Sequence, residues 1–204
     1  DEIIVANGVC EILMNILTKI KGDFEIKVPF FLEYSRALGD RLIEVNELDD
    51  FSFKNNIIIV NPNNPDGEVL DLGIIKSIAK KLEKNGKYLI YDESFADFHL
   101  REDISLIKNP SLPREKNIIL LKSLGKTYGT PGIRLGILIN SDYKKVFQWR
   151  KLLPIWNINS YAEAFLDLLP RYKKEYILSL EKVSKNTENF YSYLHKLEND
   201  NFKV

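Results

Sequence analysis

The sequence predicts an α/β fold: a three-layer sandwich with helices on both faces of a mainly parallel central sheet. Short apolar runs recur along the chain, and amphipathic helical segments separate several of them. Because these runs are apolar throughout rather than alternating, the strands should be buried on both faces, as in parallel sheets. Strands that are joined by helical crossovers lie parallel within one sheet.

The expected elements follow the chain in order. A strand is expected where a short apolar run is bounded by turn residues, and a helix where apolar residues recur every three or four positions. The expected strands cover residues 3–5, 25–28, 42–45, 55–60, 87–91, 117–121 and 135–139. The expected helices cover 9–20, 72–82, 141–153, 161–169 and 172–197, with short helices ending at 35–39 and lying at 104–107 within a polar loop at 101–114.

Composition excludes several classes of protein. The chain has 204 residues, 45% of them hydrophobic and 28% charged, with a formal net charge of zero. These values are normal for a globular domain, and no basic surplus favours nucleic acid as a partner. No apolar run has the length of a membrane helix. The single cysteine, Cys10, fits a reducing compartment, so a cytoplasmic location is expected.

A lysine lies between two of the apolar runs. Lys126 is preceded by Ser123 and followed by Arg134, in a glycine-containing loop between residues 118–121 and 135–139. Partial burial on such a loop would lower the pKa of the amine and free its lone pair to form a Schiff base. A hydroxyl and a guanidinium nearby suit a phosphate dianion. This segment therefore predicts a site for a phosphorylated carbonyl compound.

Polar residues also follow three other expected strands. Asn61-Pro-Asn-Asn-Pro-Asp-Gly67 is rich in turn residues. The segment Asp92-Glu-Ser-Phe95 carries a carboxylate, and Gly8 begins a helix whose first backbone N–H groups can bind an anion. The carboxyl ends of strands are where open α/β sheets bind ligands, so these segments should meet at one edge. His99 and His195 have no carboxylate or cysteine at metal-ligand spacing, and no metal site is expected.

Together these segments resemble the fold-type I, pyridoxal-phosphate (PLP) dependent aminotransferases. The resemblance is closest to the branch that contains histidinol-phosphate aminotransferase and threonine-phosphate decarboxylase. The family pattern Ser-x-Ser/Thr-Lys, followed by Arg-x-Gly, reads here Ser123-Leu-Gly-Lys126 and Arg134-Leu-Gly136. The family motif Asn-Pro-Asn-Asn-Pro-Thr-Gly is present with Asp66 in place of threonine.

The resemblance implies that pyridoxal 5′-phosphate is the cofactor and that Lys126 holds it as a Schiff base. Asp92 would pair with the protonated pyridine nitrogen, and Asn64 would donate to the phenolic oxygen O3′. Phe31 would cover the face of the ring, where an aromatic neighbour stacks well. Phe95 stands where this branch commonly has a tyrosine, so a second hydrogen bond to O3′ is expected to be absent.

The resemblance also implies a set of phosphate-binding groups. Gly125 occupies a position that often carries serine or threonine, so one hydroxyl is absent. The remaining groups are the side chains of Ser123 and Arg134 and the backbone amides of Gly8, Val9 and Cys10.

The resemblance covers nearly the whole chain but only the middle of a family member. The expected fold is therefore a PLP-dependent transferase large domain that is truncated at both ends. Residues 1–170 should form this domain without its N-terminal arm, and residues 171–204 the long linking helix and the start of a small C-terminal domain. The apolar stripe along residues 172–197 should pack against the large domain or a partner helix. The full-length protein is expected to be a homodimer.

The function that the resemblance implies is transamination. An amino group would move between an amino acid, or an amino-phosphate compound, and a 2-oxo acid through the Schiff base at Lys126. Two alternatives stay open: a PLP-dependent decarboxylase of a phosphorylated amino acid, and an inactive truncated domain. A nucleotide-binding protein ranks below these because both common phosphate-loop motifs are absent. Asn157 and Asn159 are candidates for the substrate side of the site or, alternatively, buried caps.

Overall fold

The computed structural model describes residues 2–99, 104–108, 115–198 and 203. The described residues form a seven-stranded sheet with the strand order β1-β7-β6-β5-β4-β2-β3. Strands β3, β2, β4, β5 and β6 are parallel, and β7 pairs antiparallel with both β6 and β1. The prediction of a mainly parallel sheet is confirmed. The strands are β1 (Ile3–Ala6), β2 (Phe24–Lys27), β3 (Leu42–Val45), β4 (Asn56–Val60), β5 (Leu89–Asp92), β6 (Ile118–Ser123) and β7 (Gly136–Ile139).

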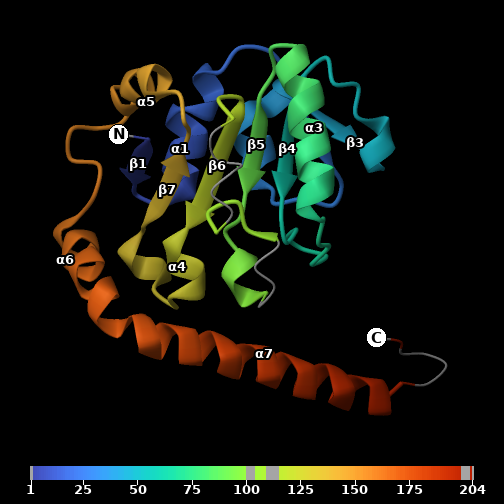
Figure 1. Ribbon diagram of the computed structural model, residues 1–204, viewed down its shortest axis with the longest axis vertical. Helices are drawn as coiled ribbons and strands as arrows, with labels where there is room; N and C mark the ends of the chain where they lie inside the picture. Colours follow the sequence, from blue (N-terminus) through green and yellow to red (C-terminus); the bar gives the residue numbers. More distant parts are fainter. Residues whose placement is uncertain (1, 100–103, 109–114, 199–202, 204) are drawn as a thin grey trace.

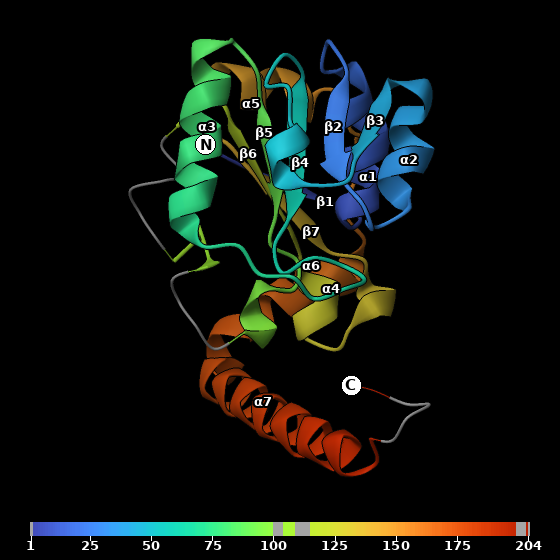
Figure 2. The same ribbon diagram turned by 90° about the vertical axis from the view of Figure 1, so that its right-hand side faces the viewer.

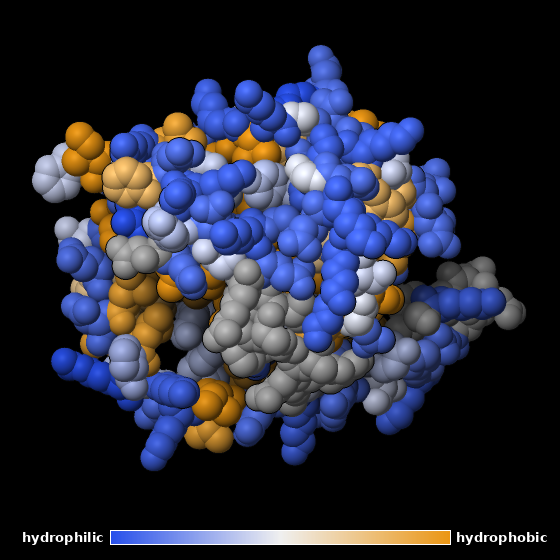
Figure 3. Space-filling view, turned by 45° about the horizontal axis from the view of Figure 1, so that its top comes forward, coloured by the Kyte–Doolittle hydropathy of each residue, from blue (hydrophilic) through white to orange (hydrophobic). Residues whose placement is uncertain are grey.

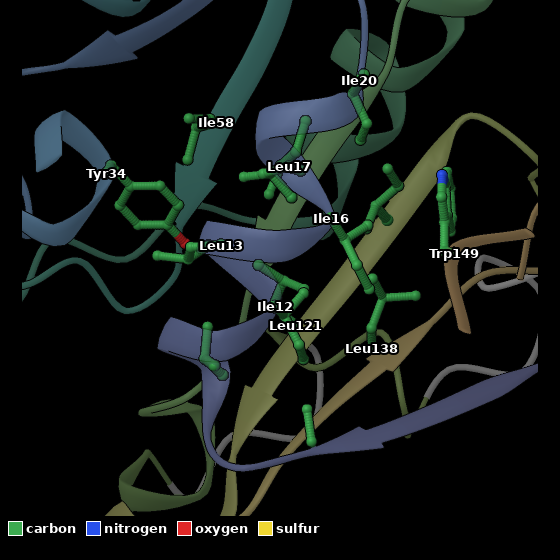
Figure 4. Close-up of a cluster of buried hydrophobic side chains, with 14 of the residues drawn as sticks. Ile12, Leu13, Ile16, Leu17, Ile20, Tyr34, Ile58, Leu121, Leu138 and Trp149 are labelled. Atoms are coloured by element: carbon green, nitrogen blue, oxygen red, sulfur yellow. The ribbon is translucent and has the colours of Figure 1, made fainter. Parts of the chain in front are cut away.

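Helices cover both faces of the sheet, which confirms the three layers (Figures 1 and 2). On one face α1, α2 and α5 bury a cluster that includes Ile12, Leu138 and Trp149 (Figure 4). On the other face α3 buries a second cluster against β4, β5 and β6. The helices are α1 (Val9–Asn15), α2 (Glu33–Leu38), α3 (Leu72–Lys84), α4 (Leu124–Thr127), α5 (Tyr143–Arg150), α6 (Ser160–Leu168) and α7 (Lys173–Lys196).

The apolar character of the strands explains their burial only at the centre of the sheet. Every residue of β4 and β5 is buried, as the unbroken apolar runs predict. At the edges the prediction of burial on both faces is wrong: Ile3 of β1 is 50% exposed and Ile43 of β3 is 39% exposed. An edge strand has a neighbour on one side only, so its outer residues lie at the rim of the layers.

The long helix α7 lies beneath the carboxyl ends of the parallel strands (Figure 1). It contacts the sheet domain near its start, where the Tyr176 hydroxyl donates to Asp97 at 2.8 Å and the Tyr176 ring stacks on Tyr128 at 4.1 Å. None of its residues is buried. The predicted packing of its apolar stripe is thus seen only at the first turns, whereas Val183 and Phe190 are exposed.

The boundary between a large domain at 1–170 and a linking helix at 171–204 stays a prediction. Residues 199–202 and 204, where a small domain was expected to begin, lie outside the described residues, as do 101–103 and 109–114 of the predicted polar loop. Polar and charged side chains dominate the face of the molecule seen in Figure 3. Within the described ranges, every helix is too short or too polar to cross a lipid bilayer.

A cluster of buried charged side chains lies at the carboxyl ends of β5 and β6. The Nζ of Lys122 is 2.9 Å from Asp97 Oδ2 and 3.9 Å from Glu93 Oε1. The Lys122 side chain is 9% exposed, and that of Glu93 is fully buried. Glu93 also accepts hydrogen bonds from the hydroxyl of Ser105 and the backbone N–H of Leu106. Although burial alone would raise the pKa of Asp97, the charge and hydrogen bond of Lys122 hold that pKa below its usual range.

We predict that Lys122→Met lowers the free energy of unfolding by about 3–5 kcal/mol, because it leaves two buried carboxylates without their cation. Since the pKa of Asp97 is lowered in the folded chain, its stabilising effect is complete above the ordinary value of 3.8 and is lost as the pH falls below it. The difference in the free energy of unfolding between the variant and the parent chain should therefore be smaller at pH 3 than at pH 7. Urea unfolding at pH 7 and pH 3 measures both effects.

The matched control is Lys27→Met. Lys27 pairs with Glu68 at 2.7 Å, but the two side chains are 21% and 39% exposed. A pair so close to solvent contributes about 1 kcal/mol or less. Equal losses in the two variants would contradict a special role for the buried cluster.

Candidate active site

A pocket lies at the carboxyl ends of β4, β5 and β6, where the predicted motifs were expected to meet. All of the residues predicted to bind the cofactor except Gly8 line it, and Gly8 lies beside Arg134. A larger cleft lies along α7 beside Tyr128 and Tyr176, but it contains none of the predicted residues. The lining residues of the first pocket are Val9, Cys10, Phe31, Val60, Asn64, Asp92, Ser94, Phe95, Ser123, Lys126 and Arg134.

Strand pairing explains why Asp92 and Ser123 share this pocket. Asp92 lies opposite Leu121 in the parallel register of β5 and β6. Because side chains alternate along a strand, Asp92 and Ser123 lie on the face covered by α1, whereas Glu93 and Lys122 lie on the other. The backbone N–H of Ser123 donates to the Ser94 hydroxyl at 2.9 Å, which ties the two strand ends together.

Asp92 is buried and accepts three hydrogen bonds. Its Oδ1 accepts from the backbone N–H of Ser94 at 2.9 Å and from the Ser94 hydroxyl at 2.5 Å. Its Oδ2 accepts from the Tyr34 hydroxyl at 2.7 Å. Burial raises the pKa of Asp92 above its usual range, while these hydrogen bonds and the charge of Lys126 act in the opposite direction. The carboxylate is thus fixed in place and directed into the pocket.

Lys126 differs from the prediction in two respects. It lies on the short helix α4 rather than on a loop, because the chain after β6 forms one helical turn. Its side chain is exposed, so the expected partial burial is wrong for this chain. The Nζ lies 5.7 Å from the centre of the Phe95 ring, at the open side of the pocket.

The asparagine-rich turn is held by hydrogen bonds that leave Asn64 in the pocket. Asn61 is fully buried, and its amide group donates to the Leu70 carbonyl and the Tyr91 hydroxyl, both at 2.8 Å. Asp66, which replaces the threonine of the motif, accepts from the Asn63 amide group at 2.8 Å and from the backbone N–H of Glu68. The substitution therefore supports the turn itself.

A close backbone contact forms the other side of the pocket. A Cβ at Gly136 would lie 2.4 Å from the backbone nitrogen of Val9, so β7 begins directly against the turn that starts α1. A Cβ at Gly8, whose φ is +84°, would lie 2.7 Å from Arg134 Nη2. Glu11 holds this turn by accepting from the backbone N–H of Asn7 at 2.7 Å. Glycine at position 136 lets β7 approach the backbone of this turn, and glycine at position 8 leaves room for the Arg134 guanidinium.

The donor set fits a flat, phosphorylated aromatic group. The Ser123 hydroxyl and the Arg134 guanidinium, with the glycine-permitted approach at Gly8, suit a phosphate dianion. Two half-buried rings, Phe31 and Phe95, suit the faces of an aromatic ring. In the described parts of the chain, no group of three or more His, Cys, Asp or Glu side chains is arranged to hold a metal ion.

Comparison with known families agrees with this geometry. The model of the family described as aminotransferase class I and II matches residues 40–186. That match covers the Asn64, Asp92, Lys126 and Arg134 motifs and most of the chain. The chain belongs to the class I and II aminotransferase family. Pyridoxal phosphate is the cofactor of this family, as the resemblance implied.

Two curated relatives of this family member are similar over most of the chain. The CMP-5′-(3-aminopropyl)phosphonate synthase of Streptomyces rubellomurinus is 33% identical over 92% of this chain and 32% of its own length. The L-serine phosphate decarboxylase of Sulfurospirillum multivorans is 28% identical over 95% of this chain and 57% of its own length. The chain thus spans about a third of the length of the first relative and somewhat over half of the second.

A solved structure shows the same fold. The histidinol-phosphate aminotransferase of Clostridium acetobutylicum superposes with a TM-score of 0.82 at 23% identity, over 97% of this chain and 62% of that one. This confirms the predicted PLP-dependent transferase large domain.

Three residues that support the site were not foreseen. Tyr34 and Ser94 bind Asp92, and Asn61 holds the turn before Asn64. A serine two residues after an aspartate is a common local turn, and this signal could have identified Ser94. Asn159 caps α6 by accepting from Ala162, and Asn157 donates to the Val5 carbonyl; both therefore bind the backbone.

We predict that Gly136→Ala lowers the free energy of unfolding by roughly 1–3 kcal/mol, because its Cβ would overlap the backbone of Val9. Gly132→Ala is the matched control, since apart from its chain neighbours no described residue has an atom within 4 Å of the Cβ position there. The control should change stability by about 0.5 kcal/mol or less. Urea unfolding of the two variants measures the difference, and an unperturbed Gly136→Ala chain would contradict the close contact.

Proposed function

We propose that the protein is a PLP-dependent enzyme that decarboxylates a phosphorylated amino acid. The observation that carries the proposal is the convergence of Asn64, Asp92 and Lys126 on one pocket beside a phosphate-binding cradle. When bound there, pyridoxal phosphate supplies a protonated pyridine ring that accepts the electron pair left when a bond at the substrate α-carbon breaks.

In this proposal each pocket residue acts on a stated atom. Asp92 holds the proton on the ring nitrogen, because a buried carboxylate beside the ring favours the charged pyridinium. The Asn64 amide donates to the phenolic oxygen, and Phe31 covers one face of the ring. The phosphate would be bound by Ser123 and Arg134 and by the backbone amides of Val9 and Cys10. The Gly8 amide, predicted to join them, instead donates to the Ala6 carbonyl at 2.7 Å.

Lys126 has two roles in this proposal. Its Nζ would hold the cofactor covalently, and as a free amine it would move a proton at the substrate α-carbon. A decarboxylase needs a proton delivered to this carbon after carbon dioxide has left. An aminotransferase needs a proton removed from the same carbon, so the same residues serve both reactions.

The choice of decarboxylation is supported by the relatives. The serine phosphate decarboxylase is similar over nearly the whole chain. The likeness to histidinol-phosphate aminotransferase lies below 25% identity and bears on the fold alone. Transamination, the first prediction from the sequence, stays a second candidate because the family itself is named for it. The homodimer and the cytoplasmic location also stay predictions.

We predict that Lys126→Ala abolishes covalent attachment of the cofactor. Borohydride reduction of the chain with pyridoxal phosphate should fix the cofactor on the peptide that contains Lys126, as read by mass spectrometry. Lys144→Ala, which removes an exposed lysine on α5, is the matched control and should label fully. Labelling of Lys126→Ala at another lysine in equal yield would overturn the assignment, and no binding to either chain would favour an inactive truncated domain.

Product analysis separates the two reactions. With O-phosphoserine or O-phosphothreonine, we expect release of carbon dioxide and formation of the phosphorylated amine without an added 2-oxo acid. Formation of the corresponding 2-oxo acid, dependent on an amino-group acceptor, would instead support transamination. Serine without a phosphate group is the control. Turnover of serine equal to that of O-phosphoserine would contradict the proposed substrate class.

A further inference from the structure

Tyr34 lies behind the pocket and is fully buried. It belongs to α2, and its ring packs in the apolar cluster with Leu13 and Ile58 (Figure 4). Its hydroxyl nevertheless reaches Asp92 Oδ2 at 2.7 Å. A buried tyrosine hydroxyl needs a partner, and here that partner is the carboxylate proposed to hold the ring proton.

The charged and polar groups around Asp92 show how much its ionised form depends on the hydrogen bond from Tyr34. Lys126 on α4 is the cation that faces it among the described residues, and its side chain is exposed. Cys10 on α1 lies near Tyr34, while Glu93 and Lys122 lie on the opposite face of the sheet. Burial raises the pKa of Asp92, so its ionised form relies on hydrogen bonds from Ser94 and Tyr34.

Tyr34 also contacts the residue proposed to cover the ring. Its ring meets that of Phe31 edge to face, with centroids 6.4 Å apart and an interplanar angle of 86°. One tyrosine therefore touches both the carboxylate and the aromatic side chain of the pocket. Its own pKa is raised well above the usual range, chiefly by burial, so the hydroxyl stays protonated and remains a donor.

We propose that Tyr34 is a positioning residue that keeps Asp92 ionised and oriented toward the cofactor ring nitrogen. This inference rests on the proposed function for its consequence in catalysis. The contact between Tyr34 and Asp92 can be tested without any cofactor. Ser94 contributes two further hydrogen bonds to Asp92, but from the same chain segment. Among the described residues, Tyr34 is thus the hydrogen-bond donor that connects Asp92 to the layer of helices.

The test compares Tyr34→Phe with Tyr91→Phe. Tyr91 is also a fully buried tyrosine on β5, but its hydroxyl binds Asn61 and the Ile104 carbonyl instead of Asp92. In the chain without cofactor, the carboxyl carbon of ¹³C-labelled aspartate is titrated by NMR, with Asp92→Asn to assign the signal. We expect the pKa of Asp92 to rise in Tyr34→Phe and to stay unchanged in Tyr91→Phe.

A second measurement uses the ring nitrogen. Tyr34→Phe should weaken binding of pyridoxal phosphate roughly ten-fold, the effect of one hydrogen bond to a charged group. Binding of the analogue with carbon in place of the ring nitrogen should not change, because it has no proton for Asp92 to hold. An equal loss for both ligands, or an unchanged Asp92 titration, would overturn the inference.

The two proposals fail in different ways. If neither the parent chain nor the variants bind pyridoxal phosphate, the proposed function fails, and the NMR titration still decides the role of Tyr34. If Tyr34→Phe does not fold, 3-fluorotyrosine at position 34 replaces it. This more acidic phenol is a stronger donor and should lower the pKa of Asp92, whereas a merely structural role predicts no shift.

Discussion

The site depends on the register of two neighbouring parallel strands. Because β5 and β6 pair with Asp92 opposite Leu121, the residues at their ends alternate in step. One face receives Asp92 and Ser123, and the other receives Glu93 and Lys122. A shift of one residue in β6 would turn Lys122 instead of Ser123 toward the pocket, and a shift in β5 would turn the Asp92 carboxylate away from it. The two faces of the sheet thus separate Asp92 and Ser123 from Glu93 and Lys122, their direct neighbours in sequence.

The sequence predicted the layers, the mainly parallel sheet and the residues of the pocket, because each motif follows a run of apolar residues that forms a strand. It did not predict the surroundings of those motifs. Tyr34 and Lys122 are a core tyrosine and a strand lysine by their spacing, and only the packing of α2 and the pairing of β5 with β6 bring them to carboxylates. Long-range contacts of this kind leave no local signal.

Lys126 shows the same limit in another form. Its neighbours in sequence predicted a buried amine on a loop, but the chain forms a helical turn and leaves the side chain exposed. The sequence motif singles out Lys126, whereas the solvent exposure of its side chain depends on the tertiary packing of neighbouring segments. The Asn61–Gly67 turn is the opposite case, since buried hydrogen bonds of its own residues fix it, and composition alone predicted it.

The backbone at Arg134 has a φ of 59°, in the left-handed region that residues with a Cβ rarely occupy. This conformation costs an arginine about 1 kcal/mol or more relative to glycine. In return the guanidinium reaches the turn at Gly8. Selection for heat resistance alone would favour glycine at this position, and selection for anion affinity favours arginine. At residue 134, evolution of a thermostable variant would therefore conflict with the proposed binding of a phosphate group.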